Sequence, residues 1–382
     1  MSETACRACR GRSGAVVLDL GRQPACDYFP RLDDPGPDPQ YPLQMWLCAA
    51  CGLAQLADDP TAAEEPRGAE PAALVAQAKD AVRRVAAAGL LPGAARVAEY
   101  GSPHGGSWLG LLAGRGLRPA SAGGQADVIV DCFGLMHAAD QRAALAERAA
   151  RVAPGGVLLL QYHSLDAIIS RGQWNALRHG HYAYYSTTAL AGMLVTHGFS
   201  ARTAWRFELY GGTILLAARR DADGTAEPDD SVRSLFAGDR AAGTADPAAL
   251  GDLQDVSGRQ ATGLRDWLTA QRQAGRTVLG YGAASRAVAL LRLSEVNREL
   301  LPAIADSSPA KQGLRMPGTD IPIVGPGYLV DRRPDVVLLF LEDLRTEVMA
   351  AYPEVEASGG QWVDAQLLSS GHGGSGGLQQ DA

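Results

Sequence analysis

The chain has 382 residues, which is long enough for two or three domains that each bury a core. Hydrophobic residues make up 46% of it and charged residues 20%, a composition typical of globular proteins. The net charge of −7 argues against a nucleic-acid partner, and no apolar run is long enough to span a membrane. Because the first residues lack the apolar core of a secretion signal, we expect a cytoplasmic protein.

Two Cys-x-x-Cys pairs lie near the start of the chain, with short strands predicted between them. Each pair can form a tight turn that points two thiolates at one ion, so the spacing predicts a tetrahedral zinc site. The four expected ligands are Cys6, Cys9, Cys48 and Cys51. Because protein ligands fill all four positions, the zinc is expected to be structural; the alternatives are four buried thiols or a redox pair. Cys26 and Cys132 are interpreted as ordinary buried residues.

The middle of the chain alternates strands and helices. A helix is predicted within residues 70–91, with Pro71 at its start and Gly93 just past its end. A strand from residue 96 then enters the glycine-rich turn "GSPHGG", and further helices and strands lead to a closing hairpin near residue 220. This alternation predicts an α/β sheet, and the turn has the form of a loop that offers backbone N–H groups to a cofactor.

A second α/β unit follows a polar linker and helix that extend to about residue 250. It begins at "RTVLGYGAASRAVALL", where a strand turns through glycines into a helix, and it continues through "DVVLLFLEDL". Asp306 ends the next strand, about two dozen residues after the glycines. This arrangement is similar to a dinucleotide-binding fingerprint that lacks its third glycine, and the alternative is a plain structural turn.

The segments "CRAC", "VLDLGRQPACDYF", "YPLQMWLCAACGLAQL", "GRTVLGYGAASRA", "ADSSPAKQG" and "PGTDIPIVGP" carry a family resemblance. They resemble the three-domain zinc-containing sugar C-methyltransferases of antibiotic deoxysugar biosynthesis. The resemblance implies S-adenosylmethionine as cofactor of the middle domain and a nucleotide-diphosphate sugar as substrate. In that family the third domain supplies most of the nucleotide-sugar pocket.

On this resemblance the predicted fold class is α/β, with three domains and a tail. The predicted ranges are a zinc-binding β subdomain over 1–70, a shortened Rossmann-like methyltransferase domain over 71–220, a second Rossmann-like domain over 221–368 and a flexible tail over 369–382.

The resemblance also implies a histidine base that removes a sugar C3 proton next to the 4-ketone, so that the enolate takes a methyl group. His181 lies at the position of that base, and His137 at the position of a second active-site histidine. Alternatively, both are hydrogen-bonded residues at strand ends. His163 and His179 are considered as pocket residues only.

The resemblance assigns two further groups of residues. The cofactor loop consists of Glu99, Gly101, Gly105 and Gly106. The expected substrate-binding residues are Arg178, Gly280, Tyr281, Gly282, Ser285, Arg286, Asp306 and Lys311.

The sequence departs from the family in three places. Arg178 and Gly180 replace a tyrosine and a glutamate of the base motif, and residues 61–77 lack a catalytic tyrosine. The chain also runs from the helix after the glycine turn almost directly to the strand at 126–132. About one βαβ unit is therefore missing, including the acid that would bind the adenosine ribose.

Three functions follow as hypotheses. The first is S-adenosylmethionine-dependent C-methylation of a nucleotide-linked keto sugar. The second is an enzyme that has lost the methyl donor and uses His181 for epimerisation, isomerisation or elimination. The third is a non-catalytic partner protein of a sugar pathway.

Overall fold

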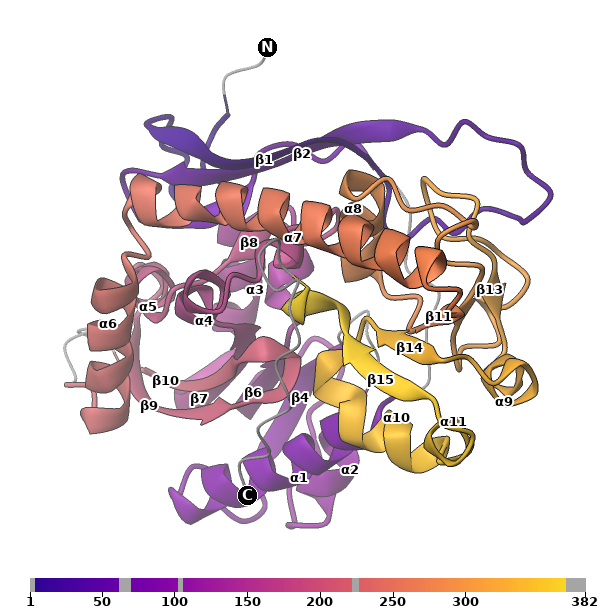
Figure 1. Ribbon diagram of the computed structural model, residues 1–382. Coiled ribbons are helices and arrows are strands. Elements are labelled where there is room, and N and C mark those ends of the chain that lie inside the picture. Colours follow the sequence, from indigo (N-terminus) through magenta and orange to yellow (C-terminus); the bar gives the residue numbers. More distant parts are fainter. Residues whose placement is uncertain (1–3, 62–69, 102–105, 222–226, 369–382) are drawn as a thin grey trace. The chain divides into compact units, whose positions relative to one another are not determined.

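The computed structural model describes residues 4–61, 70–101, 106–221 and 227–368, and these residues form two compact units (Figure 1). Unit 1 contains the described residues of 1–28 and 39–254, and unit 2 contains those of 29–38 and 255–382. The longest helix, α7 (Pro247–Gln273), passes from one unit into the other along the chain.

A small antiparallel sheet in unit 1 carries the N-terminal cysteines. Its strand order is β1-β2-β3-β8, with β1 (Gly14–Pro24), β2 (Gln40–Cys48), β3 (Ala54–Leu56) and β8 (Ala183–Tyr184). The fourth strand comes from a distant part of the chain, since Ala54 pairs with Tyr184 and Gln55 with Ala183. The predicted strands between the cysteine pairs, β1 and β2, are therefore present, and β3, which follows the second pair, joins them to the strand that comes after His181.

The central sheet of unit 1 has six strands in the order β5-β4-β6-β7-β10-β9. Strands β5, β4, β6 and β7 run parallel to one another, and β10 pairs antiparallel with both β7 and β9. Their bounds are β4 (Arg96–Tyr100), β5 (Arg118–Pro119), β6 (Ala126–Cys132), β7 (Val152–His163), β9 (Phe199–Phe207) and β10 (Thr213–Arg220). The predicted α/β alternation and the closing hairpin are confirmed.

Helices cover both faces of this sheet, which explains why its inner strands are apolar at nearly every position. On β6, Val128 and Val130 belong to a core cluster that also contains residues of α1 (Ala72–Ala87) and α2 (Leu109–Ala113). Figure 1 shows these two helices next to each other. Ile129, between the two valines, belongs to the cluster on the opposite face. That face is covered by α3 (Gln141–Arg151), α5 (Thr187–Val195) and α6 (Asp230–Ala242). The shorter elements of unit 1 are α4 (Leu165–Ser170) and 3₁₀ turns at Leu135–His137, Trp174–Ala176 and Leu209–Gly211.

The edge strand β5 is only two residues long. Arg118 and Pro119 pair with Arg96 and Val97, which are at the start of β4, and residues 120–125 then lead directly to β6. Sites in parallel sheets are built at the carboxyl ends of the strands. Because β5 stops at the opposite end of β4, it brings no side chain to that edge.

Unit 2 is built on a five-stranded parallel sheet in the order β13-β12-β11-β14-β15. Its strands are β11 (Val278–Tyr281), β12 (Ile304–Ala305), β13 (Ile323–Val324), β14 (Val336–Leu339) and β15 (Gln361–Asp364). Its other helices are α8 (Ser285–Leu293), α9 (Gly327–Arg332), α10 (Arg345–Ala351) and α11 (Glu354–Ala357), with 3₁₀ turns at Glu342–Leu344 and Ala365–Leu367. The predicted second α/β unit is therefore confirmed.

A buried ion pair fixes residues 29–38 within unit 2. Arg315 donates from both terminal nitrogens to the two carboxylate oxygens of Asp38, at 2.7 and 2.6 Å. Both side chains are at most 7% exposed. Burial alone would raise the pKa of Asp38, but the hydrogen bonds from Arg315 and the Gly318 N–H lower it. The pair therefore stays ionised at neutral pH.

A second buried pair, Arg148 with Asp131, joins α3 to the end of β6 in unit 1, and its side chains are 7% and 1% exposed. The same carboxylate also accepts the backbone N–H of Leu135 at 3.0 Å. Burial raises the pKa of Asp131 even though the Arg148 charge opposes the rise. The carboxylate thus depends on the arginine to remain charged.

We expect Arg148→Met to destabilise the protein by about 3–5 kcal/mol at pH 7, because it leaves a buried carboxylate without its countercharge. Without the arginine, the folded state binds a proton at Asp131 more readily than the unfolded chain does, so the loss should shrink as the pH falls. Urea unfolding at pH 7 and pH 5 measures both effects. Arg96→Met, which breaks an exposed pair with Asp127, is the control and should change the stability little, because solvent screens the pair. If Arg148→Met lowers the free energy of unfolding no more than Arg96→Met does, the prediction is wrong.

Candidate functional site

The four predicted zinc ligands lie together in unit 1. Their sulfur atoms are all within 4.8 Å of one another. The Sγ–Sγ distance is 3.6 Å both for Cys6 and Cys51 and for Cys9 and Cys48. Tetrahedral zinc with Zn–S bonds of about 2.3 Å sets its sulfurs about 3.8 Å apart. The cluster therefore has the dimensions of a Cys₄ zinc site, as the spacing of the cysteines predicted.

Cys6 is the cysteine of the cluster whose pKa is lowered toward the thiolate, the form that binds metal, whereas burial raises the pKa of Cys9. The hydrogen bond from the Cys51 thiol lowers the pKa of Cys6 to about 5, and the same interaction raises the pKa of Cys51. The backbone N–H of Gly11 also donates to the sulfur of Cys9 at 3.4 Å. With all four positions held by protein, this site has no open position for a reacting group.

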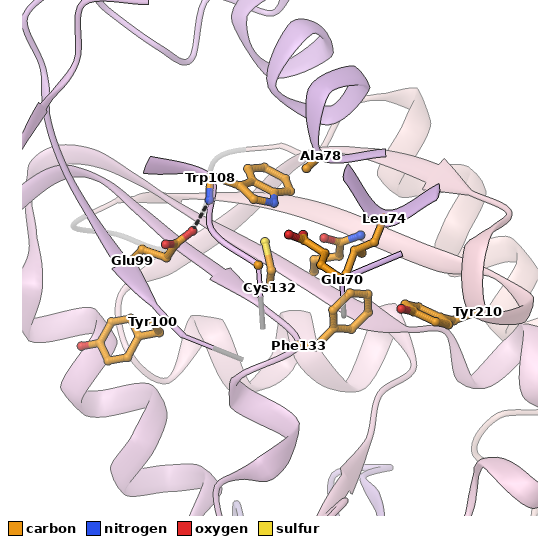
Figure 2. A pocket seen from close by; sticks show the side chains of 11 residues that line it. Glu70, Leu74, Ala78, Glu99, Tyr100, Trp108, Cys132, Phe133 and Tyr210 are labelled. Carbon is orange, nitrogen blue, oxygen red and sulfur yellow. Dashed lines mark hydrogen bonds between the residues drawn. The ribbon is translucent and has the colours of Figure 1, made fainter. Parts of the chain in front are cut away.

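The glycine turn after β4 is closed by Glu99. Its carboxylate accepts the backbone N–H of Trp108 and the hydroxyl of Ser107, each at 2.6 Å, just before α2 begins (Figure 2). Gly106 has φ of +84°, a backbone conformation that residues other than glycine rarely adopt. Gly101 ends the described part before the turn, and Gly105 lies outside the described residues.

A pocket opens beside this turn at the carboxyl edge of the central sheet (Figure 2). Its free volume is about 20 Å³, room for about one water molecule. Small-molecule sites usually offer about 300–1,000 Å³. The carboxylate of Glu70 lies over the turn, so a Cβ on Gly106 would be 2.6 Å from its Oε1. The lining residues are Glu70, Leu74, Ala78, Glu99, Tyr100, Gly106, Trp108, Cys132, Phe133, Gln161 and Tyr210.

Phe133 and Tyr210 connect the pocket to the histidines. The two rings line the pocket and meet edge to face with centroids 6.0 Å apart. The ring of His163 stacks on Phe133 at 4.9 Å and meets Tyr210 at 5.7 Å. Both aromatic residues have positive φ, 63° for Phe133 and 55° for Tyr210, which costs about 1–3 kcal/mol each. Backbone strain of this kind is concentrated at functional sites, so it supports placing the site here.

The structure brings His137 and His181 together, with ring centroids 4.5 Å apart and planes at 82°. His163 lies on the other side of His181 at 6.4 Å, with the two rings nearly parallel. His181 is 4% exposed, and His137 and His163 are half-buried. Three imidazoles therefore converge next to the pocket. His179 instead lies against Tyr41 and bonds to the Pro42 carbonyl at 3.1 Å.

A tight turn from Arg178 to His181 positions this cluster. The N–H of His181 donates to the carbonyl of Arg178, and Gly180 has φ of +80° at the third position of the turn. The N–H of Gly180 donates to Asp59 at 2.6 Å, and its carbonyl is 3.0 Å from Nδ1 of His137. The side chain of Arg178 donates from Nε to Nε2 of His181 at 2.9 Å.

Cys132 differs from the sequence-based interpretation. It was expected to be an ordinary buried residue, but it is partly exposed and lines the pocket. The largest effect on its thiol is burial, which raises its pKa well above the usual value. Cys132 is therefore a neutral thiol in the pocket wall and a poor nucleophile.

In unit 2, the glycine loop after β11 is held by Asp306 and Lys311. The two carboxylate oxygens of Asp306 accept the N–H groups of Ala283 and Ser308, at 2.7 and 2.8 Å. The ammonium of Lys311 donates to the Ala283 carbonyl at 2.9 Å and lies 4.6 Å from the centre of the Phe29 ring. Both side chains thus support the loop from within unit 2, and their assignment to substrate binding stays a prediction.

The other predicted residues of this loop lie close together along the chain. Gly282 has φ of +95°, and a Cβ on Gly280 would be 2.7 Å from the Ile304 side chain. Both glycines are thus required by local geometry. Tyr281 is buried against Tyr352 and Trp362, Ser285 is buried at the start of α8, and Arg286 faces Asp343 at 4.0 Å.

Several pocket residues carry no local sequence signal that identifies them. Trp108, Phe133 and Tyr210 are single aromatic residues on three separate segments. Glu70 precedes α1 and belongs to no motif that the sequence analysis identifies. A topological argument finds part of the set: Cys132, Phe133 and His163 follow or end neighbouring parallel strands, and these ends meet at one edge.

Three family models match consecutive parts of the chain. They describe a zinc binding domain at residues 6–64, a methyltransferase domain at 114–204 and a C-methyltransferase C-terminal domain at 208–365. The glycine turn at 101–106 lies outside these ranges.

A curated relative, the C-methyltransferase NovU of Streptomyces niveus, is 26% identical over 233 residues, or 61% of this chain. The match covers 54% of the relative, so the chain spans about half of that protein's length. Among solved structures, the magnesium protoporphyrin IX methyltransferase of Synechocystis PCC 6803 is 14% identical, with a TM-score of 0.29 over 39% of this chain and 84% of that one. The amino pentose methyltransferase CalS10 of Micromonospora echinaspora is 17% identical, with a TM-score of 0.25 over 38% of this chain and 90% of that one.

No helix in the described part of the chain combines the length and the apolar character needed to cross a bilayer. The zinc-binding, methyltransferase and C-methyltransferase C-terminal domains follow one another along the chain, and the first contains a cysteine cluster of zinc-site dimensions. The chain therefore belongs to the three-domain, zinc-containing C-methyltransferase family.

Proposed function

We propose that this protein forms an enolate from a nucleotide-linked keto sugar and that C-methylation is the outcome of that step. The observation that carries the proposal is the histidine cluster, in which His137 and His181 lie 4.5 Å apart next to the pocket. The similarity to the C-methyltransferase NovU supports methylation at carbon. In this mechanism His181 takes the proton from the carbon beside the ketone, and the electron pair moves to the ketone oxygen.

Unit 2 is the proposed site of the nucleotide. The loop after β11 ends at the start of α8, where backbone N–H groups favour a diphosphate, and Arg286 adds a positive charge. Asp306 and Lys311 hold the shape of this loop through Ala283.

S-adenosylmethionine, when bound, supplies the methyl group that the enolate attacks. The described residues fit only part of this cofactor. Glu99 accepts the Trp108 N–H, Gly106 has a positive φ, and aromatic rings line the pocket. However, β5 brings no acid to the carboxyl edge for the ribose, and the free volume beside the described lining residues is about 20 Å³. We therefore derive the enolate step from the protein's own residues and no step through the cofactor.

The missing ribose acid and the small free volume of the pocket favour a second candidate function. Without a methyl donor, the enolate would take back a proton from a protonated histidine, which epimerises or isomerises the sugar. The histidine cluster supports this outcome equally well, since the first step is identical. A zinc ion held by the four cysteines would have a structural role in either case.

Titration of S-adenosylmethionine into the protein, followed by calorimetry, separates the two candidates. We expect no saturable heat from the protein alone, because the pocket has room for about one water molecule. Saturable binding in the presence of a nucleotide-linked keto sugar would support methylation, and its absence would support proton return.

Glu70→Ala tests whether the Glu70 carboxylate limits the free volume of the pocket. Tight binding by the unliganded wild type would contradict the volume argument.

Deuterium exchange from D₂O into the carbon beside the ketone measures the enolate step directly. We expect exchange with the wild type and a decrease of about 10²–10⁴-fold for His181→Ala, the range typical of a general base. His197→Ala, at the end of α5 and outside the cluster, should exchange at the wild-type rate. If the wild type shows no exchange and binds no methyl donor, the protein is a non-catalytic partner and the proposal fails.

Metal analysis of the purified protein should find one zinc ion per chain. We expect Cys6→Ser and Cys51→Ser to lose the zinc and to lower the midpoint of thermal unfolding, because a structural zinc contributes folding free energy. Acidification should release the ion as the thiolates are protonated. Cys26→Ala, a buried cysteine outside the cluster, should keep the full zinc content. A metal-free wild type with an unchanged unfolding midpoint would contradict a structural zinc site.

A further inference from the structure

The side chain of Arg178 makes a contact that limits the chemistry of His181. Its Nε–H group donates to Nε2 of the imidazole at 2.9 Å. Its backbone is fixed at the same time, because the N–H of Arg178 donates to the hydroxyl of Tyr184 at 3.1 Å, and that tyrosine is 1% exposed. The guanidinium therefore reaches His181 from a well-anchored position.

This contact determines which nitrogen of His181 carries the proton. A guanidinium has only N–H donors and cannot accept a hydrogen bond. Nε2 must therefore be the acceptor, so the proton of the neutral imidazole is on Nδ1. The nitrogen beside Arg178 is thus the basic one.

His137 has the same proton arrangement for a different reason. Its Nδ1 is 3.0 Å from the carbonyl oxygen of Gly180, which can only accept, so Nδ1 carries the proton. Nε2 of His137 is then also the unprotonated nitrogen. One turn, from Arg178 to His181, thus sets both imidazoles: its arginine side chain acts on His181, and its glycine carbonyl acts on His137.

We propose that Arg178 is the positioning residue of the enolate step: it keeps Nε2 of His181 unprotonated and then stabilises the negative charge on the substrate oxygen. This inference rests on the function proposed above. The ketone oxygen is attached to the carbon next to the one that loses its proton, so a base nitrogen at that proton lies within a few ångströms of the oxygen. Arg178 already adjoins this nitrogen.

The proton transfer changes the charge of His181 and of the ketone oxygen. The guanidinium first moves from Nε2 to the ketone oxygen, which frees the lone pair of that nitrogen. The C–H bond then breaks, an N–H bond forms at Nε2, and the electron pair moves to the ketone oxygen. His181 becomes an imidazolium as the oxygen becomes negative, so the guanidinium is repelled by the ring and attracted to the oxygen. A positive group here compensates for the tyrosine and glutamate that the base motif lacks.

Nitrogen-15 NMR of the histidine side chains tests the first part without a substrate. With full-length, zinc-loaded protein, we expect the His181 signal, assigned with His181→Gln, to show a protonated Nδ1 and an unprotonated Nε2. In Arg178→Met the proton should move at least partly to Nε2, the usual site in a free imidazole. Arg171→Met, which removes an arginine paired with Glu208 at the surface, is the matched control and should leave the signal unchanged. A wild-type His181 with its proton on Nε2 would overturn the proposal.

Deuterium exchange into a nucleotide-linked keto sugar tests the second part. We expect Arg178→Met to lower kcat for exchange by about 10²–10³-fold, the range for loss of one oxyanion donor, with a small change in KM. Arg178→Lys keeps the charge and should recover part of the rate, which a purely structural role would not produce. Equal rates for Arg178→Met and wild type would overturn the proposal. If the wild type itself does not exchange, the proposed function fails, whereas the NMR result still decides the positioning of His181.

Discussion

The arrangement of the site depends on the left-handed conformation of Gly180. With φ of +80°, this residue turns its N–H toward Asp59 and its carbonyl toward His137, and it lets Arg178 and His181 approach each other across a single turn. A side chain at this position would disfavour that conformation and would release all three contacts together. The zinc-bearing sheet contributes through β8, which continues from the turn and pairs with β3. The stability of the metal subdomain and the geometry of the histidines are thus properties of one connected structure.

The sequence predicts those parts of the fold that depend on local spacing. Two Cys-x-x-Cys pairs predict a metal site whatever the length of the segment between them. The apolar run through Val128–Val130 predicts a strand that is covered on both faces. The pairing of β3 with β8 joins residues about 130 apart, and no local pattern indicates it. The contact of Arg178 with His181 is also absent from the sequence, because an arginine near a histidine has many conformations.

The two halves of the chemistry have different structural support. The proton-transfer half is assembled from side chains that are buried, hydrogen-bonded and close together. The proposed methyl-donor half has a two-residue edge strand and a pocket with little free volume. The described residues therefore give the proposed proton transfer more support than the proposed methyl transfer.

Phe133 and Tyr210 have a further consequence for how this protein can change. Both hold aromatic rings on a backbone conformation that glycine would adopt without strain. Glycine at either position would relieve about 1–3 kcal/mol of backbone strain and would remove a ring from the surface between the pocket and the histidines. One substitution at these positions therefore acts on backbone strain and on the shape of the site at the same time.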